Sequence, residues 1–168
     1  MGFEKISVRE LENAIESIGS KWMLITVEDK AQGRVNAMTA SWGAMGVLWN
    51  KNLCICFVRP QRHTAALLED EEEFSIAFMS EEHRDALKLC GRESGRDTDK
   101  LAKCGLSVSR ELGVPIVEEA QTVLICKKLY EDEIKENCFL DKSLLSNYAN
   151  GDYHRFYVCE IKDAYRKG

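Results

Sequence analysis

The residues best suited to chemistry lie in three short polar stretches. The first, "VNAMTASW", places Asn36, Thr39 and Ser41 in a segment otherwise rich in Val, Met and Ala. Burying a hydroxyl without a hydrogen-bond partner costs about 1–3 kcal/mol, so these groups need partners. Two explanations stay open: the polar side chains face solvent on one side of a strand, or they line a polar ligand whose apolar part Trp42 covers.

The second stretch, "RPQRHT", follows an expected strand and begins an expected helix. The N-terminus of a helix offers free N–H groups and the positive end of the helix dipole, and arginine adds a planar fork of donors. Arg59 and Thr64 therefore suit a phosphate site. The alternative is an ordinary turn followed by Thr64 as the N-cap of the helix.

The third stretch, "GRESGRDTDK", combines small residues with Arg96 and Lys100. Its Ser-Gly backbone can approach an anion closely, and Lys100 adds a point charge. The spacing is not that of a phosphate-binding P-loop, and no GxGxxG dinucleotide motif is present. A solvated charged loop is the alternative interpretation.

Composition limits the classes of protein to consider. The 168 residues fit one domain, residues 1–168, and 45% hydrophobic with 30% charged residues is typical of a globular protein. A net charge of −5 disfavours nucleic acid or an anionic membrane as partner. No apolar run approaches the roughly 18–20 residues that span a bilayer, and the first residues lack an apolar signal core, so we expect a cytoplasmic protein.

The seven cysteines follow no repeated spacing and include no CxxC motif. Without a secretory signal they are expected to stay reduced. Cys54 and Cys56 would face the same side of a strand, where free cysteine usually packs as a small hydrophobic residue. The sequence therefore predicts no metal site.

The expected elements are mostly strands with short helices between them. A helix is expected over 7–19, with Ser7 and Glu10 as a capping box, and a hairpin joins strands 21–29 and 34–42. Further strands are expected at 53–58, 74–79, 120–134 and 153–166, helices at 64–73, 81–91 and 99–105, and a helical or loop insertion at 143–151. This order predicts a mainly β protein with peripheral helices (α+β), a β-barrel rather than a doubly wound parallel sheet.

The order of these pieces resembles the flavin reductase-like, FMN-binding split-barrel family, which includes flavoredoxins. The matching pieces run from about Val35 to Ile161: "VNAMTASW", "RPQRHT", "FSIAFM", "SGRDTDK", "GVPIVEEA" and "YHRFYVCEI". The resemblance implies a homodimeric split β-barrel that holds one FMN per subunit near the interface. It also implies an FMN-binding oxidoreductase that transfers electrons through the flavin.

The resemblance further implies a set of cofactor-binding residues. Along the flavin would lie Asn36, Met38, Thr39, Ala40, Ser41 and Trp42. Arg59 and Thr64 would hold the phosphate and ribityl end, and Ser94, Arg96 and Lys100 would complete the anionic pocket. On this interpretation, FMN satisfies the hydroxyls and the amide of the first stretch. Hydride transfer between a nicotinamide and a flavin requires no acid–base residue, so no catalytic side chain is nominated.

The electron donor stays open between NAD(P)H and a redox protein. Relatives that use NAD(P)H often carry Gly-Asp-His before the last strand, whereas this chain has Gly151, Asp152, Tyr153 and then His154. A one-residue shift on a strand moves a side chain to the other face. Two alternatives remain: a non-enzymatic flavin-binding or redox-sensing protein with a reactive cysteine, and a pyridoxamine-phosphate-oxidase-like enzyme.

Overall fold

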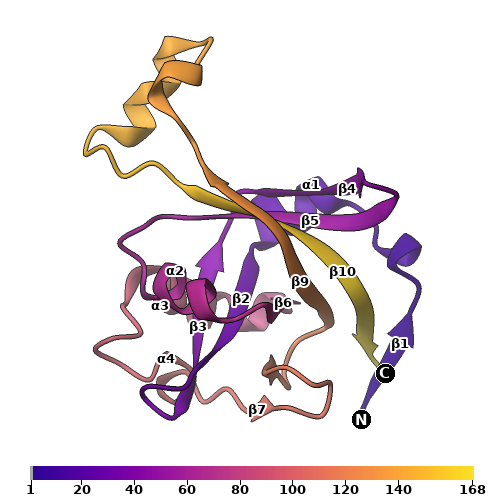
Figure 1. Ribbon diagram of the computed structural model, residues 1–168. Coiled ribbons are helices and arrows are strands. Elements are labelled where there is room, and N and C mark those ends of the chain that lie inside the picture. The colour runs from indigo at the N-terminus through magenta and orange to yellow at the C-terminus, as the bar shows by residue number, and fades with distance from the viewer. Residues whose placement is uncertain (1) are drawn as a thin grey trace.

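The computed structural model describes residues 2–168 as a curled antiparallel sheet with short helices around it (Figure 1). Seven strands pair in the order β3-β2-β6-β9-β10-β5-β4, and β1 adds to β10. Their bounds are β1 (Phe3–Ile6), β2 (Met23–Asp29), β3 (Arg34–Ala40), β4 (Gly43–Leu48), β5 (Lys51–Val58), β6 (Glu73–Phe78), β9 (Thr122–Glu133) and β10 (Arg155–Lys167). Two short strands, β7 (Val108–Ser109) and β8 (Ile116–Val117), pair separately. The mainly β class with peripheral helices is thus confirmed.

The sheet closes on itself because its two edges are consecutive in the chain. Strands β3 and β4 stand at opposite ends of the strand order, yet only Ser41 and Trp42 separate them. Three Cα–Cα steps span at most about 11 Å, so the sheet must curl until its edges meet. Because β3 and β4 do not pair with each other, the barrel stays split at this point. The expected split β-barrel is confirmed.

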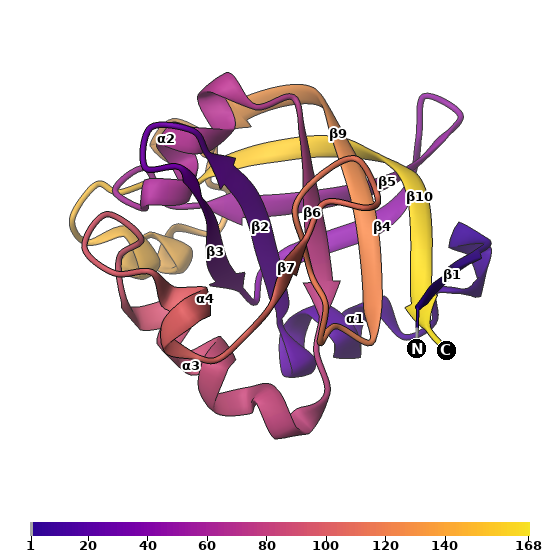
Figure 2. The same ribbon diagram turned by 90° about the horizontal axis from the view of Figure 1, so that it is seen from below.

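Both faces of one half of the sheet are buried, because side chains alternate along each strand. Ile25 and Phe74 point into the barrel interior, where Leu68 of α2 (His63–Asp70) also packs. Leu24 and its neighbours face outward beneath Leu87 of α3 (Arg84–Arg92) and Leu101 of α4 (Lys100–Lys103). Figure 2 shows α3 and α4 beside β2 and β3. This packing fixes the positions of both helices relative to β3.

Between β9 and β10 the chain leaves the barrel as an arm, which we define as residues 134–154. It contains the 3₁₀ helices η4 (Glu136–Cys138) and η5 (Lys142–Tyr148) and projects beyond the sheet in Figure 1. Its far end is solvated, since Leu140 is fully exposed, whereas Tyr148 and His154 on the returning part are buried. The insertion expected at 143–151 therefore lies within a longer excursion that returns to the barrel.

The single helix expected over 7–19 is wrong. The Ser7–Glu10 capping box is confirmed, but it begins only a 3₁₀ turn, η1 (Val8–Glu10). Asn13 then adopts the left-handed conformation (φ 51°), and α1 (Ala14–Glu16) leads into a π-helical turn, η2 (Ser17–Lys21). Helical spacing predicted one buried face, yet Ile15 is 91% exposed. The apolar residues reach the barrel from separate turns.

Four other expectations about local structure need correction. Strand β3 ends at Ala40 rather than at residue 42, and the chain then forms β4, which the sequence did not predict. Trp49 and Asn50 form the two-residue turn between β4 and β5, and both have positive φ. Because tryptophan rarely adopts positive φ, nothing in the sequence indicated a turn at this position. Helix α2 begins at His63 after Arg62, so Thr64 is not its N-cap. Strand β1 was also missed.

No helix within residues 2–168 is long and apolar enough to cross a membrane.

The closure of the barrel predicts different effects for two glycines of β4. A Cβ at Gly43 would lie 2.6 Å from the carbonyl oxygen of Ile55 and 2.9 Å from Met23, whereas a Cβ at Gly46 meets nothing within 4 Å. We expect Gly43→Ala to lower the free energy of unfolding by about 1–3 kcal/mol because backbone must move. Gly46→Ala is the matched control and should change it by less than about 0.5 kcal/mol. Urea denaturation measures both; equal effects would contradict the close approach.

Candidate functional site

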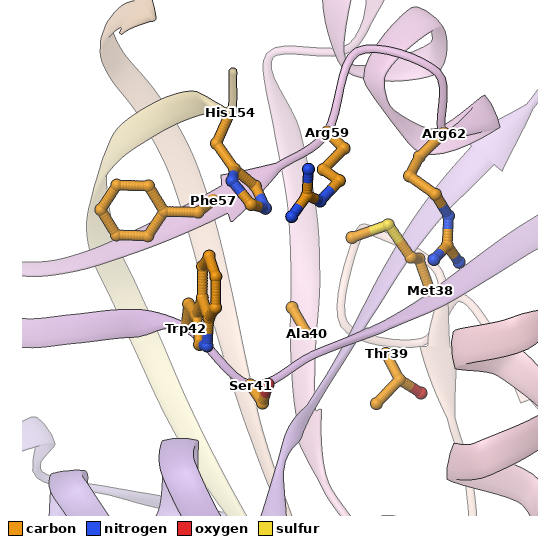
Figure 3. Close-up of a pocket in the computed structure, with 9 residues that line it drawn as sticks. All are labelled: Met38, Thr39, Ala40, Ser41, Trp42, Phe57, Arg59, Arg62 and His154. Carbon is orange, nitrogen blue, oxygen red and sulfur yellow. The ribbon is translucent and has the colours of Figure 1, made fainter. Parts of the chain in front are cut away.

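A pocket of about 240 Å³ lies where the barrel is split. The end of β3 and the two-residue link form one side, and the end of β5 and the returning arm form the other (Figure 3). It is lined by Met38, Thr39, Ala40, Ser41, Trp42, Phe57, Arg59, Arg62 and His154. The pocket therefore combines aromatic rings, hydroxyls and two guanidinium groups within a small space.

Six of the eleven residues predicted from the sequence line this pocket: Met38, Thr39, Ala40, Ser41, Trp42 and Arg59. The other five, Asn36, Thr64, Ser94, Arg96 and Lys100, lie outside its lining. Alternation along β3 does not explain this division, because Asn36 lies on the same face as Met38 and Ala40, further from the split. Asn36 is nearly fully buried and bonds within the protein, whereas the backbone of residues 38–42 runs along the pocket.

The protein itself satisfies much of the polar stretch on β3. The Thr39 hydroxyl donates to the Leu87 carbonyl oxygen at 2.6 Å, and Asn36 Nδ2 donates to Thr64 Oγ1 at 2.8 Å. The protein therefore supplies partners for these two donors itself, without a ligand. Asn36 Oδ1 is buried and has no hydrogen-bond partner within residues 2–168.

Loop 92–99 packs tightly over this buried amide. A Cβ at Gly95 would lie 1.9 Å from Asn36 Oδ1 and 3.2 Å from His63 Cδ2, so only glycine fits. Arg34 donates to the Gly95 carbonyl, and Asp29 pairs with His63 Nε2 at 2.6 Å. These contacts tie the loop to β3 and to the start of α2, next to the pocket.

The cations around the pocket also hold backbone carbonyl oxygens. Arg62 donates to Gly91 and Cys90 at 2.7 and 3.0 Å. Arg96 donates to Gln61 at 3.0 Å, and Lys100 Nζ lies 3.3–3.4 Å from the carbonyl oxygens of Cys90 and Glu93. Burial lowers the pKa of Lys100 to about 8. The basic loop therefore folds around its own cations, and Ser94 caps it locally by accepting from the Arg96 amide.

Sequence reasoning missed Phe57, Arg62 and His154. The ring centroid of His154 lies 5.1 Å from that of Trp42 and 6.3 Å from that of Phe57. Tyr148 hydrogen-bonds His154 Nδ1 at 2.9 Å. Residue 154 precedes β10, which begins at Arg155, so the argument from strand alternation does not apply to it. Its sequence signal was its place just after "GDY".

Burial and the neighbouring Arg59 charge lower the pKa of His154 to about 4. The imidazole is therefore neutral near pH 7. A hydrogen bond from Gln61, with Arg59 adding to it, lowers the pKa of Asp152, which stays ionised. The aromatic side of the pocket thus carries no net charge from His154.

The remaining chemistry-bearing residues do not form a second centre. Within residues 2–168, no group of three or more His, Cys, Asp or Glu side chains could hold a metal ion. The seven cysteines are free, as expected, and lie outside the pocket lining. Burial raises the pKa of the Cys54 and Cys126 thiols well above the ordinary range, so they act as packing groups.

A split β-barrel with a pocket at its open seam defines the structural class, and the comparisons with known proteins give the family. Residues 15–167 match the model of the flavin reductase like domain, so the chain belongs to that family. No curated protein sequence matches it significantly.

Three solved structures share the fold at identities too low to show more than the fold. An FMN-binding domain of a flavin reductases-like enzyme from Shewanella baltica has a TM-score of 0.69 and 18% identity, covering 98% of this chain and 77% of that chain. An FMN-binding protein from Thermus thermophilus with bound p-hydroxybenzaldehyde gives 0.68 and 21%, covering 98% and 81%. Flavoredoxin from Methanosarcina acetivorans gives 0.67 and 22%, covering 98% and 76%.

The low pKa of His154 predicts a loss of stability in acid. The unfolded chain takes up this proton near pH 6.5 and the folded chain only near pH 4, so the unfolded state binds more protons between these values. The free energy of unfolding should fall as pH drops from 6.5 to 4, by at most about 3 kcal/mol from this residue.

Urea denaturation of His154→Gln across this pH range checks the assignment. In the variant, the free energy of unfolding should fall much less between pH 6.5 and 4 than in the wild type. The control His83→Gln, outside the pocket, should keep the wild-type fall. Parallel pH curves for the wild type and His154→Gln would contradict the prediction.

Proposed function

We propose that this protein binds FMN in the pocket at the barrel split and acts as an FMN-dependent oxidoreductase of the flavin reductase-like or flavoredoxin-like type. The observation that supports it best is the composition of one pocket. Aromatic rings stand on one side and the guanidinium of Arg62 on the other, in a family whose solved relatives include FMN-binding proteins.

The donor set fits a flat ring system that carries an anion. Trp42 and Phe57 offer apolar ring surface, and Ser41 keeps a hydroxyl at the pocket wall. Arg62 uses one N–H of each terminal nitrogen on carbonyl oxygens, and a guanidinium has five donors. Arg62 can therefore bind an anion without releasing Cys90 or Gly91.

Bound FMN would supply hydride or single-electron transfer, chemistry that no side chain of the pocket provides. The chain's own residues bind and orient the group. Residues 38–42 of β3 and the link would lie along the ring system, and Arg62 would hold the anionic end. Asn36, Thr64, Ser94, Arg96 and Lys100 would act from behind by fixing loop 92–99 and the start of α2. Trp42, Phe57 and His154 would exclude water from one side.

We also propose a homodimer with the pocket near its interface. The pocket volume of about 240 Å³ is below the roughly 300–1,000 Å³ of typical small-molecule sites, so a large cofactor would extend beyond it. Trp42 is 46% exposed, and Val47, Leu48 and Trp49 on the adjoining hairpin are exposed apolar residues. A second copy placed against this hairpin would cover both the apolar surface and the open side of the pocket.

An absorption spectrum of the purified protein is the first test. Bands near about 370 and 450 nm, with FMN released on heating, support the proposal. A colourless protein that also fails to bind added FMN would refute it. Bleaching by NADH or NADPH, followed by turnover with an acceptor, then separates a reductase from a non-enzymatic flavin-binding or redox-sensing protein and identifies the donor class.

The close fit of Gly95 gives a second test of the site. Gly95→Ala should push loop 92–99 away from Asn36 and raise the FMN dissociation constant about fivefold to 100-fold, equivalent to about 1–3 kcal/mol. Gly91→Ala is a matched control, because its Cβ would lie at an ordinary 3.6 Å from Thr39. Titration by flavin fluorescence measures both. An unchanged FMN dissociation constant in Gly95→Ala would show that loop 92–99 does not contribute to FMN binding.

A further inference from the structure

We propose that Arg59 is a positioning residue, which latches the returning arm over the pocket and so places His154, and that it is not an anion ligand. The inference rests on the proposed function, because the pocket in question is the proposed flavin pocket. It concerns the segment Asn147–His154, whose "GDYH" run was considered above only in connection with the use of NAD(P)H.

The Arg59 side chain forms its hydrogen bonds with residues of the arm. Nη1 pairs with the Asp152 carboxylate, and Nη2 donates to the Asn147 carbonyl oxygen at 3.0 Å. The guanidinium carbon also lies 5.3 Å from the centre of the Tyr148 ring, within the range of a cation–π contact. Gln61, two residues further along the same loop, donates to Asp152 at 2.9 Å. Two side chains of the "RPQRHT" stretch therefore hold one carboxylate of the arm.

The latched segment continues directly to the pocket. The rings of Tyr148 and Tyr153 stack with centroids 4.9 Å apart, and the Tyr148 hydroxyl bonds His154 Nδ1 at 2.9 Å. His154 then lies next to both Trp42 and Phe57 (Figure 3). Movement of residues 147–153 would release the imidazole from this position, so Arg59 acts on the pocket through the arm.

The two arginines of the pocket differ in what balances their charge. Arg62 bonds only to carbonyl oxygens, so its positive charge stays available to an anion. Arg59 pairs with the ionised Asp152, whose negative charge would repel an incoming phosphate. The charge pattern therefore assigns the anionic end of a ligand to Arg62 and the uncharged ring end to the wall that Arg59 supports.

Four variants of the full chain test the latch: Asp152→Asn, Arg59→Met, the double variant of these two, and Arg59→Lys. Glu69→Gln is the matched control, because it breaks another arginine–carboxylate pair, with Arg155, outside the pocket. The first readout is amide hydrogen exchange of residues 143–153 in flavin-free protein. The second is the FMN dissociation constant, and thermal melting verifies that each variant folds.

If Arg59 latches the arm, both single variants speed exchange in 143–153 about tenfold, and the double variant adds little more. Both singles also weaken FMN binding, Arg59→Lys does not restore either readout because lysine lacks the fork, and Glu69→Gln changes neither. If Arg59 binds the anion instead, Asp152→Asn frees it and leaves or strengthens FMN binding, while Arg59→Met weakens binding without faster exchange. That pattern overturns the proposal.

The exchange readout needs no flavin, so it decides the latch even when the wild-type chain binds no FMN. In that case the proposed function fails and the latch stands or falls on its own measurement. Unchanged exchange in both Asp152→Asn and Arg59→Met also overturns the latch, whatever the affinity for FMN.

Discussion

The structure depends on one short connection. Ser41 and Trp42 join the two edge strands of the main sheet, so the barrel cannot open further than two residues allow. Strands β3 and β4 pair with β2 and β5 and not with each other, so a seam stays open between them. A pocket at this seam follows from the topology alone. The close approach of Gly43 to Ile55 shows how tightly β4 lies against β5 directly after this connection.

The residues around the seam are positioned by polar contacts with the backbone more than by apolar packing. Arg62 and Lys100 donate to carbonyl oxygens of the last turn of α3, those of Gly91 and Cys90. Thr39 donates to the carbonyl oxygen of Leu87, nearer the start of the same helix. The contacts with Cys90 and Gly91 satisfy carbonyls that the end of the helix would otherwise leave to water. Cations next to a pocket therefore serve the loop first, and an anion can use only the donors that remain.

The sequence predicted what alternation and turn residues encode. Strands β2, β5, β6, β9 and β10 have apolar patterns of their own, so they were expected near their observed positions. Strand β4 has two glycines and a turn at Trp49-Asn50, and the 7–19 segment has helical spacing that local backbone overrides at Asn13. Such elements form because the barrel closes around them, and closure is a tertiary property that no local pattern contains.

The residues of the site likewise fall into those that a local motif predicts and those that only the fold brings together. Residues 38–42 are contiguous, so one motif was enough to predict them together. Phe57 and His154 reach the pocket only because β5 and β10 are neighbours in the sheet, which places the end of one strand beside the start of the other. Arg59 and Arg62 are three residues apart and chemically identical, yet one meets a carboxylate and the other only carbonyls. Partner charge, which only the fold sets, gives the pocket a cationic end and an uncharged end, the polarity that a ring bearing a phosphate requires.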